Sequence, residues 1–469
     1  MEDPSCKHRP RAIHLLLKAT GACIPFLGLV ALGAQSMCPS TPVGLLAPAD
    51  SVSLDRAGRF MAANADGSTV AVGSWNHVHA GVRSGAVWVR SNVGSPNEVE
   101  RKIVPANPFD FMAFSASLAM DASGQVLIVG CTPGLGADRV FVYRFDGRRW
   151  NEEWVVSESC CDDLGYSVAI SAQGDVFAAG APRREECCTT YTGGIYVYRR
   201  GVAGWYREAL VFPTDSVSNF YIGNSIAMSG DGRYVAGRTF VSQTSPVPSG
   251  AVYVFEHNAG SWTQVAKLQE PVAYSNGGFG MALAMDYDGR TLVAGNTSDS
   301  RYASLNGAAT IFRVTSTGWS FDGVVLPNPP IAGGYFGGSV SLNNSGDRLF
   351  VGEVGAVVGG VDDAGRVDEF HRGMAGWSRV ASHVTPTPGA TGAGFGDVVL
   401  ASASGHRWIA SEPWADFNGS DSGIAHVFDS TCDDPVVYCT AQTNTLGCLP
   451  QIGAQGTPSA SSTSGFRIS

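Results

Sequence analysis

One phrase recurs seven times along this chain of 469 residues. Each copy opens with an apolar or aromatic residue that is followed ten positions later by a glycine; two clear copies read FGMALAMDYDGRTLVAG and FGGSVSLNNSGDRLFVGE. Successive copies begin 57, 50, 58, 57, 57 and 59 residues apart, at positions 57, 114, 164, 222, 279, 336 and 395. Self-similarity at such a period indicates an array of like units, each of which buries its apolar face against its neighbours. The repeat therefore predicts one body rather than several domains.

Each unit predicts four antiparallel strands. The first is short and rich in small residues, as in SIAM at 225–228, and a tight turn with Asp-Gly follows it in three units. The second is apolar, as in TLVAG, and after a variable loop the third reads GAVYVF, GAATIF or a related version. Seven such sheets around an axis make an all-β, seven-bladed β-propeller. The fourth strand begins near a tryptophan that we expect to pack between blades. These residues are Trp150, Trp205, Trp262, Trp319 and Trp377.

The two ends of the array complement each other. The seventh unit stops after its third strand, GIAHVF, which ends at Phe428. The segment 41–48, TPVGLLAP, resembles fourth strands such as WTQVAKLQEP. We expect this N-terminal strand to complete the seventh blade, because closure of the ring removes sheet edges that would otherwise pair with other chains.

Three features of the repeat resemble the FG-GAP family: the Phe-Gly that opens several units, the Gly180-Ala181-Pro182 that follows a second strand, and the GAVYVF third strand. That family forms the seven-bladed propeller of integrin α chains and of many secreted bacterial proteins. The resemblance covers residues 45–430 and implies the fold. It leaves the function open, because propellers host binding proteins and enzymes alike.

The first 36 residues differ from the rest. Lys7, Arg9 and Arg11 precede an apolar run over 22–34, which is typical of a secretory signal peptide and short for a membrane span. An uncleaved membrane anchor is the alternative interpretation. We therefore expect a signal peptide at 1–36, a propeller at 37–430 and a partly disordered, cysteine-containing tail at 431–469. The protein would be secreted or held at the cell surface.

Two of the eleven cysteines lie in the signal segment, so nine remain, which agrees with an oxidising compartment. We expect two disulfides between two cysteine pairs in loops of the third unit, with the pairing order open. A third would lock the ring at its closing strand, and a fourth would form a small loop in the tail. The two pairs in the third unit are Cys160 with Cys161 and Cys187 with Cys188, and each disulfide there would join one pair to the other. The disulfide at the closing strand would join Cys38 and Cys432, and the disulfide in the tail would join Cys439 and Cys448. Cys131 is left over.

Charge and turn composition limit the ligands of the chain. The formal net charge is −10 and no run of Lys and Arg follows the signal segment, so nucleic-acid binding is not expected. Several integrin blades carry calcium loops with alternating oxygen ligands, and the turns here do not match them. Asp286 with Asp288 comes nearest to such a loop, but its outer ligand positions are apolar. Asp416 with Asp421 in a later loop is a separate weak candidate. We therefore expect no cofactor at these turns.

The predicted innermost strands supply no catalytic constellation. They offer small residues that we expect to pack at the axis, including Ser117, Ser167 and Ser339. The nine histidines are scattered. His77 and His79 could ligate zinc, but two histidines in a polar loop are expected to be solvated. Catalysis from residues in loops remains open.

The links into the first strands and the loops between second and third strands emerge on one face. Their aromatic residues suit recognition of protein or carbohydrate, and mutual packing of the loops is the alternative. The leading hypothesis is a monomeric, secreted, non-catalytic propeller that binds an extracellular protein or glycan through this face. The alternatives are a secreted polysaccharide hydrolase or lyase with a loop-borne site, and a structural component of the cell envelope. The candidate binding residues are Trp75, Tyr191, Tyr221, Tyr274, Tyr335 and Trp414; the same loops carry Phe220 and Tyr302.

Overall fold

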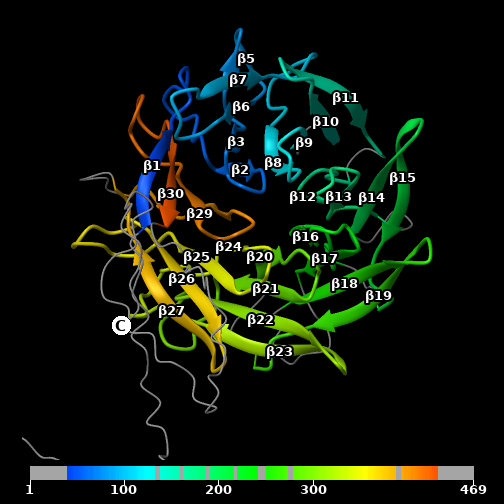
Figure 1. Ribbon diagram of the computed structural model, residues 1–469, viewed down its shortest axis with the longest axis vertical. Coiled ribbons are helices and arrows are strands. Elements are labelled where there is room, and N and C mark those ends of the chain that lie inside the picture. Colours follow the sequence, from blue (N-terminus) through cyan, green and yellow to red (C-terminus); the bar gives the residue numbers. More distant parts are fainter. Residues whose placement is uncertain are drawn as a thin grey trace, which may run out of the picture. The chain divides into compact units, whose positions relative to one another are not determined.

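The computed structural model describes residues 40–131, 138–158, 162–185, 191–215, 219–240, 250–272, 278–386 and 392–430. The chain divides into two units, Met1–Ser36 and Met37–Ser469, and all described residues belong to the second. They form seven four-stranded antiparallel sheets, arranged as blades around an axis (Figure 1). Within these ranges there is no helix long and apolar enough to cross a membrane. The predicted all-β, seven-bladed propeller is confirmed.

Each blade runs outward from its innermost strand. Blade 1 has β2 (Phe60–Ala63), β3 (Thr69–Ser74), β6 (Ala86–Ser91) and β7 (Val99–Ile103), and blade 2 has β8 (Phe114–Met120), β9 (Val126–Cys131), β10 (Arg139–Phe145) and β11 (Trp150–Val156). Blade 3 has β12 (Val168–Ile170), β13 (Val176–Ala181), β14 (Gly194–Gly201) and β15 (Gly204–Val211), and blade 4 has β16 (Ile226–Met228), β17 (Tyr234–Thr239), β18 (Ala251–Asn258) and β19 (Ser261–Leu268). Blade 5 has β20 (Phe279–Met285), β21 (Thr291–Asn296), β22 (Ala308–Thr315) and β23 (Gly318–Val325), and blade 6 has β24 (Ser339–Leu342), β25 (Arg348–Glu353), β26 (Arg366–Gly373) and β27 (Gly376–His383). Blade 7 has β28 (Val399–Ala401), β29 (Arg407–Glu412), β30 (Ile424–Ser430) and β1 (Ser40–Leu46). A small hairpin, β4 (Val78–His79) and β5 (Val82–Arg83), lies between β3 and β6.

The N-terminal strand closes the ring, as predicted. β1 pairs antiparallel with β30, with Leu46 opposite Ala425, and Figure 1 shows the two strands side by side. Leu46 is 1% exposed and packs in a cluster with Ala57 and Val70 at the junction of blades 7 and 1. The first and last strands of the propeller are therefore joined by backbone hydrogen bonds and by a shared core.

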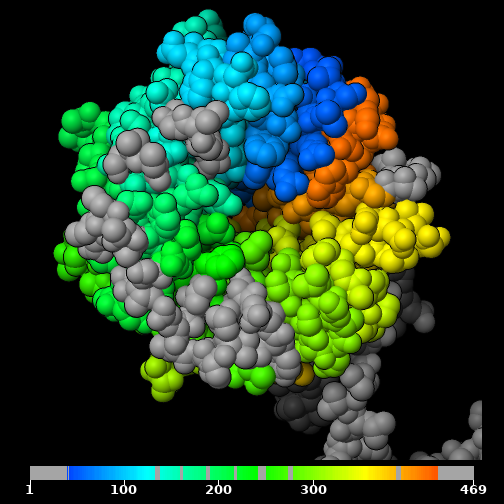
Figure 2. Space-filling model, turned by 180° about the vertical axis from the view of Figure 1, so that it is seen from behind, coloured from blue at the N-terminus to red at the C-terminus, as the bar shows by residue number. Residues whose placement is uncertain are grey.

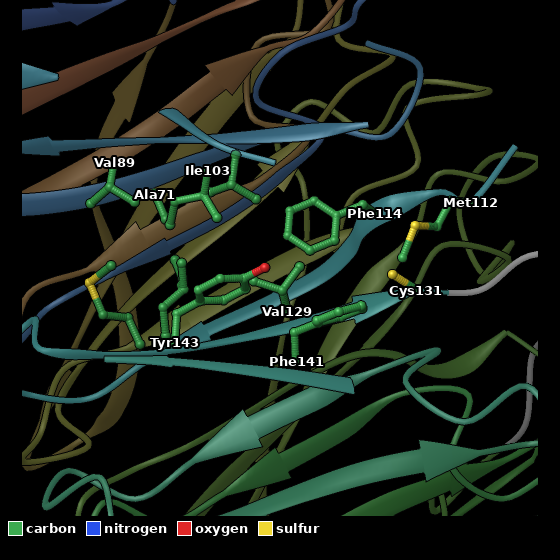
Figure 3. Packing of buried hydrophobic residues seen from close by; sticks show 13 residues of the cluster. Ala71, Val89, Ile103, Met112, Phe114, Val129, Cys131, Phe141 and Tyr143 are labelled. Atoms are coloured by element: carbon green, nitrogen blue, oxygen red, sulfur yellow. The ribbon is translucent and has the colours of Figure 1, made fainter. Parts of the chain in front are cut away.

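The middle strands are buried on both sheet faces. In β18 and β22, the first five residues are all buried, so the inward and outward alternation of a one-sided sheet is absent. The cause is that each blade packs against a neighbour on either face. Between blades 1 and 2, for example, Val89 and Ile103 face Phe114 and Tyr143 (Figure 3). A single blade would expose apolar side chains on both faces, so each unit is expected to depend on its neighbours for stability.

The repeated Phe-Gly joins neighbouring blades through their backbones. The N–H of Phe336, at the start of blade 6, donates to the carbonyl of Asn306 in blade 5 at 3.1 Å. Gly307 has φ +84°, and a Cβ placed on it would lie 2.0 Å from the Phe336 carbonyl oxygen. On β21, a Cβ on Gly295 would lie 1.9 Å from the Gly337 oxygen. Glycine is required at both points because two backbones approach too closely for any side chain.

The turns between first and second strands form a second ring around the axis. In every blade a backbone N–H of this turn donates to a turn carbonyl of the next blade, at 2.6 to 3.1 Å. In donor-to-acceptor order the pairs are Ala65–Ala122, Ala122–Ala172, Ala172–Gly230, Asp231–Tyr287, Tyr287–Asn344, Asn344–Ala403 and Ala403–Ala65. The last bond returns to blade 1, so the ring closes at the axis as well as at the rim.

The recurring tryptophans lie at the blade junctions near the rim. Trp262 of blade 4 donates to Glu208 of blade 3 at 3.0 Å, and Trp377 of blade 6 donates to Asp322 of blade 5 at 3.1 Å. Each carboxylate is the extra residue of a β-bulge in its fourth strand. Glu153, at the bulge of β11, likewise accepts from Arg200 of blade 3. The predicted role of these tryptophans between blades is confirmed for Trp262 and Trp377.

Candidate functional site

The axial serines bind backbone groups rather than one another. Four of them bond to the next blade at 2.7 to 2.9 Å. Ser117 donates to Gly165 O, Ser167 donates to Gly223 O, Ser339 accepts from Val399 N, and Ser341 accepts from Ala401 N. These contacts confirm that the four serines pack the blades, and none of the four has a histidine as a hydrogen-bond partner among the described residues.

Seven equivalent positions of the repeat surround the axis on the loop face, and we call them the axial mouth. Each lies two residues after the apolar or aromatic residue that opens a unit, at the loop-face end of the innermost strand. They are Arg59, Ala116, Tyr166, Asn224, Met281, Gly338 and Asp397. Figure 2 shows this face, which is hollowed at its centre where the blue, green and orange parts of the chain meet. The repeat thus brings seven variable positions together around one opening.

Blade 4 departs from the repeat at Arg238. The penultimate residue of the second strand is glycine in five blades and serine in blade 7, whereas β17 has this arginine. The Arg238 side chain is buried, and its Nη1 donates to Asn224 Oδ1 at 3.2 Å and to Met281 Sδ at 2.8 Å. Its guanidinium also lies 5.4 Å from the ring centroid of Phe240. Burial lowers the pKa of Arg238 to about 10, and nearby Tyr166 opposes this shift. One buried cation therefore holds two mouth residues and one loop aromatic.

Beside Arg238, three aromatic residues form a cluster that we call the aromatic platform. Tyr191 and Tyr221 stack at 5.7 Å between ring centroids with 21° between planes, and Phe240 meets Tyr221 edge-on at 6.5 Å. Tyr191 is 38% exposed and Phe240 is 50% exposed. The Phe240 N–H donates to the carbonyl of Phe220 at 2.8 Å, and Phe220 is itself buried in the blade core. The platform is therefore partly exposed to solvent, and a backbone hydrogen bond from Phe240 to the core residue Phe220 holds it in place.

The backbone at Tyr221 has an unfavourable conformation for this residue. Its φ is +52°, and the equivalent position is also left-handed in five other blades, at Arg56, Ala113, Asp163, Tyr335 and Gly394. This geometry belongs to the repeat and favours glycine or asparagine; a tyrosine there costs about 1 kcal/mol. Because the same conformation recurs at Arg56, Ala113, Asp163 and Tyr335, it is a property of the scaffold that positions the Tyr221 ring.

The other candidate binding residues are dispersed. Trp75 follows β3 in blade 1 and Tyr335 precedes blade 6, and both are partly exposed. Trp414 of blade 7 packs against Gly394 and lies 5.6 Å from the Arg59 guanidinium. Of the six predicted binding residues, the structure brings Tyr191 and Tyr221 together. Tyr274 lies outside the described residues, as do Cys38, Cys160, Cys161, Cys187, Cys188, Cys432, Cys439 and Cys448.

Sequence reasoning missed Phe240 and Arg238. The signal for Arg238 was present, because YVAGRT breaks the pattern of second strands such as TLVAGN and VLIVGC. The sequence also suggested that Phe220 is one of the exposed loop aromatics, whereas its side chain lies in the core. Cys131, the cysteine left over in the predicted pairing, is buried and forms no disulfide.

The carboxylates considered as metal ligands bond to protein groups. Asp286 Oδ1 accepts the N–H groups of Arg290 and Thr291 within its own turn, and burial raises the pKa of Asp286. Asp416 accepts the N–H of Asp421, which in turn pairs with Arg56 at 3.2 Å. Within the described ranges, no group of three or more Asp, Glu, His or Cys residues could hold a metal ion.

The expectation that His77 is solvated is wrong. His77 is buried, with Nδ1 2.8 Å from Asp55 Oδ2 and Nε2 2.7 Å from Lys102 Nζ. Its ring packs edge-on against Trp88. His79 lies in the exposed small hairpin. The link from β1 and the outer strand β7 cover His77, which spacing along the chain does not reveal.

Blade 6 contains a buried acid whose ionisation should stabilise the fold. Glu369 lies 2.7 Å from His371 Nε2 and 3.2 Å from His383 Nε2. Burial alone would raise the pKa of Glu369, but hydrogen bonds from both histidines outweigh burial and lower it from 4.5 to about 2. The stabilisation is therefore present above pH 4.5 and is lost as the pH falls toward 2.

We expect Glu369→Gln to lower the melting temperature at pH 7 and the difference from the parent protein to shrink between pH 4.5 and pH 3. Calorimetry across this range measures the effect. The exposed Glu152→Gln serves as the control and should show little difference at any pH. A Glu369→Gln difference that stays constant down to pH 3 would contradict the assignment.

These features define the class of the protein as a seven-bladed β-propeller of four-stranded antiparallel blades. No family model matches the chain, and no curated protein matches it. The FG-GAP relationship therefore stays a prediction that rests on the repeat itself.

Proposed function

We propose that the protein is an exported, non-catalytic binding protein whose loop face recognises an extracellular glycan. The aromatic platform would contact the apolar face of a sugar ring, and the neighbouring mouth residues would bond its hydroxyls. Asn224 and Tyr166 supply the polar groups, and Arg238 orients Asn224. Export rests on the predicted signal segment.

One observation carries the proposal: two exposed aromatic rings, Tyr191 and Phe240, and the half-buried ring of Tyr221 meet from separate loops beside the axial mouth. Clustered exposed aromatics are uncommon on a surface without a partner, and Tyr is a frequent binding hot spot. The stacked pair of Tyr191 and Tyr221 offers a flat surface. A protein ligand is the second candidate for the same surface.

The catalytic alternative has less support from the axial mouth. Hydrolysis of a polysaccharide usually requires two carboxyl groups on either side of the scissile bond. The seven mouth positions include one carboxyl group, Asp397, whose pKa burial raises to about 6 while Arg59 lowers it. A single acid beside an arginine suits hydrogen bonding to a ligand better than paired acid and base chemistry.

A substitution series tests the platform. We expect Tyr191→Ala, Tyr221→Ala and Phe240→Ala each to weaken ligand binding at least about tenfold, which corresponds to about 1.4 kcal/mol. A glycan array and an extracellular-protein array would identify the ligand, and titration calorimetry would measure the affinities. Tyr302→Ala is the matched control, because Tyr302 is a 66% exposed loop tyrosine of blade 5, whereas the platform residues belong to blades 3 and 4.

The outcomes separate the alternatives. Binding to a protein but to no glycan would assign the same face to protein recognition. Empty arrays together with turnover in a panel of polysaccharide hydrolase and lyase substrates would overturn the proposal in favour of an enzyme. Co-purification with cell-wall material alone would favour a structural component of the envelope.

A further inference from the structure

The junction of blades 1 and 2 departs from the other blade junctions at the rim. β11, β15 and β23 each place a bulge carboxylate against a donor of the next blade. β7 pairs with β6 without any register shift, so blade 1 has neither the bulge nor its carboxylate. The side chain that reaches blade 2 from β7 is Arg101. A cation therefore lies at this junction, whereas the bulges of β11, β15 and β23 carry an acid and those of β19, β27 and β1 carry a valine.

Arg101 is held firmly by blade 2. Its Nε donates to the carbonyl of Arg148 at 2.9 Å, and its guanidinium lies 4.9 Å from the centroid of the Phe145 ring. Among the described residues, no partner bonds its two terminal nitrogens. The guanidinium is thus fixed in position and retains N–H groups for a ligand.

A groove runs along this junction. Its volume is about 420 Å³, within the range of small-ligand sites. Arg101, Arg148 and Arg149 line it with Ile103, Tyr143 and Trp150. Arg148 and Arg149 come from the tight turn between β10 and β11, so two short basic pairs that are far apart in sequence meet here.

The acids around the groove make few close ion pairs with the side chains of Arg101, Arg148 and Arg149 within the described ranges. Asp146 accepts the backbone N–H groups of Arg148 and Arg149 at 2.8 and 2.9 Å, and its nearest approach to the Arg149 side chain is 3.8 Å. Glu152 pairs across from Tyr143 and has no ion pair with these arginines within the described ranges. Lys102, the remaining cation in the wall, pairs with Asp50 at 2.7 Å. The groove therefore carries three arginines against one nearby turn carboxylate and one exposed glutamate.

We propose that this groove is a second binding site, which takes the sulfate or carboxylate groups of an acidic polysaccharide. Arginine donates in a planar fork that matches these oxyanions, and one fixed guanidinium in the same groove as two exposed arginines allows contact with adjacent charged groups. Trp150 and Ile103 provide an apolar part of the wall, which would contact the sugar rings that carry these charged groups. The site is at the rim and is independent of the platform on the loop face.

The geometry favours a short acidic segment over a nucleic acid. Phosphate-backbone binding depends on a long track of cations, and the net charge of the chain is −10. The groove is confined to one blade junction, and at the junctions where acids occupy the bulges, arginines such as Arg200 and Arg372 are paired with carboxylates. A polysaccharide can place an anionic group on every sugar or two and needs only a few contacts.

The test compares four immobilised polymers with the full chain: dextran sulfate, polygalacturonate, neutral dextran and polyphosphate. We expect dextran sulfate or polygalacturonate to bind, with affinity that falls as NaCl rises, and neutral dextran not to bind. The double variant Arg148→Ala/Arg149→Ala should bind at least about tenfold more weakly, because it removes two charge-assisted contacts. Both side chains are exposed, so its melting temperature should match that of the parent.

The matched control is Arg183→Ala/Arg207→Ala. It removes the same net charge from side chains that are 59% and 54% exposed but are already paired with Asp163 and Glu158. Binding by the control should stay within about twofold of the parent. Three results would overturn the proposal: no binding of either acidic polysaccharide at low salt, equal losses in both double variants, or polyphosphate binding as tight as that of the acidic polysaccharides.

Discussion

Gly307→Ala is expected to lower the free energy of unfolding by about 4 kcal/mol or more. The new Cβ would lie 2.0 Å from the carbonyl oxygen of Phe336, and φ +84° already disfavours alanine. Phe336 cannot withdraw easily, because its N–H is bonded to Asn306 and its ring is fully buried. The junction of blades 5 and 6 would have to open, which would expose core on both sides.

Two companion substitutions separate the causes. Gly333 has φ +73°, and a Cβ placed on it would meet no atom within 4 Å. Gly333→Ala should therefore lower the free energy of unfolding by only about 1 kcal/mol, through backbone strain. Gly295→Ala has no left-handed φ, but its Cβ would meet the Gly337 oxygen at 1.9 Å, so it isolates the steric effect. Urea unfolding followed by circular dichroism measures all three. Equal losses in the three variants would show that close approach of the blades is not the cause.

The second large effect concerns ring closure. Leu46→Ala should lower the free energy of unfolding by about 3 kcal/mol, because Leu46 is 1% exposed in the cluster shared by blades 7 and 1. Leu45→Ala is the adjacent control, and its 38% exposed side chain should cost less than about 1 kcal/mol. Thermal and urea unfolding of both variants measure the difference.

Failure of this prediction would be informative about the N-terminal strand. If both leucines cost equally little, β1 would contribute hydrogen bonds at the rim without closing the core. A large loss for Leu46→Ala, together with aggregation on heating, is expected because loosening β1 uncovers the edge of β30.

The candidate site could be read from the sequence only in part. Tyr191 and Tyr221 were recognisable as loop aromatics because the repeat assigns each position to a strand or a loop. Their stacking was not predictable, because the two residues belong to successive blades and meet through loop conformations that the repeat does not encode. Trp75 and Trp414 are also aromatic residues in loops of this face, but they belong to blades 1 and 7 and are not part of the platform.

Buried charge was the least accessible feature. From its position in a polar loop we predicted that His77 is solvated. In the structure, Asp55 and Lys102 from distant segments enclose it. The groove at Arg101 was hidden for the same reason. Its cations come from two short basic pairs that are far apart in the sequence and meet where blade 1 packs against blade 2.

The sequence by itself determined the seven blades, their strand order and the closing role of the N-terminal strand. Glycine spacing and apolar patterning are local constraints that repeat, so each copy supports the same interpretation. The tertiary structure decided which variable side chains meet: the platform at blades 3 and 4, the mouth around the axis, and the groove between blades 1 and 2. Those contacts depend on where loops and bulges place residues in space, and the departures from the repeat that create them occur once each.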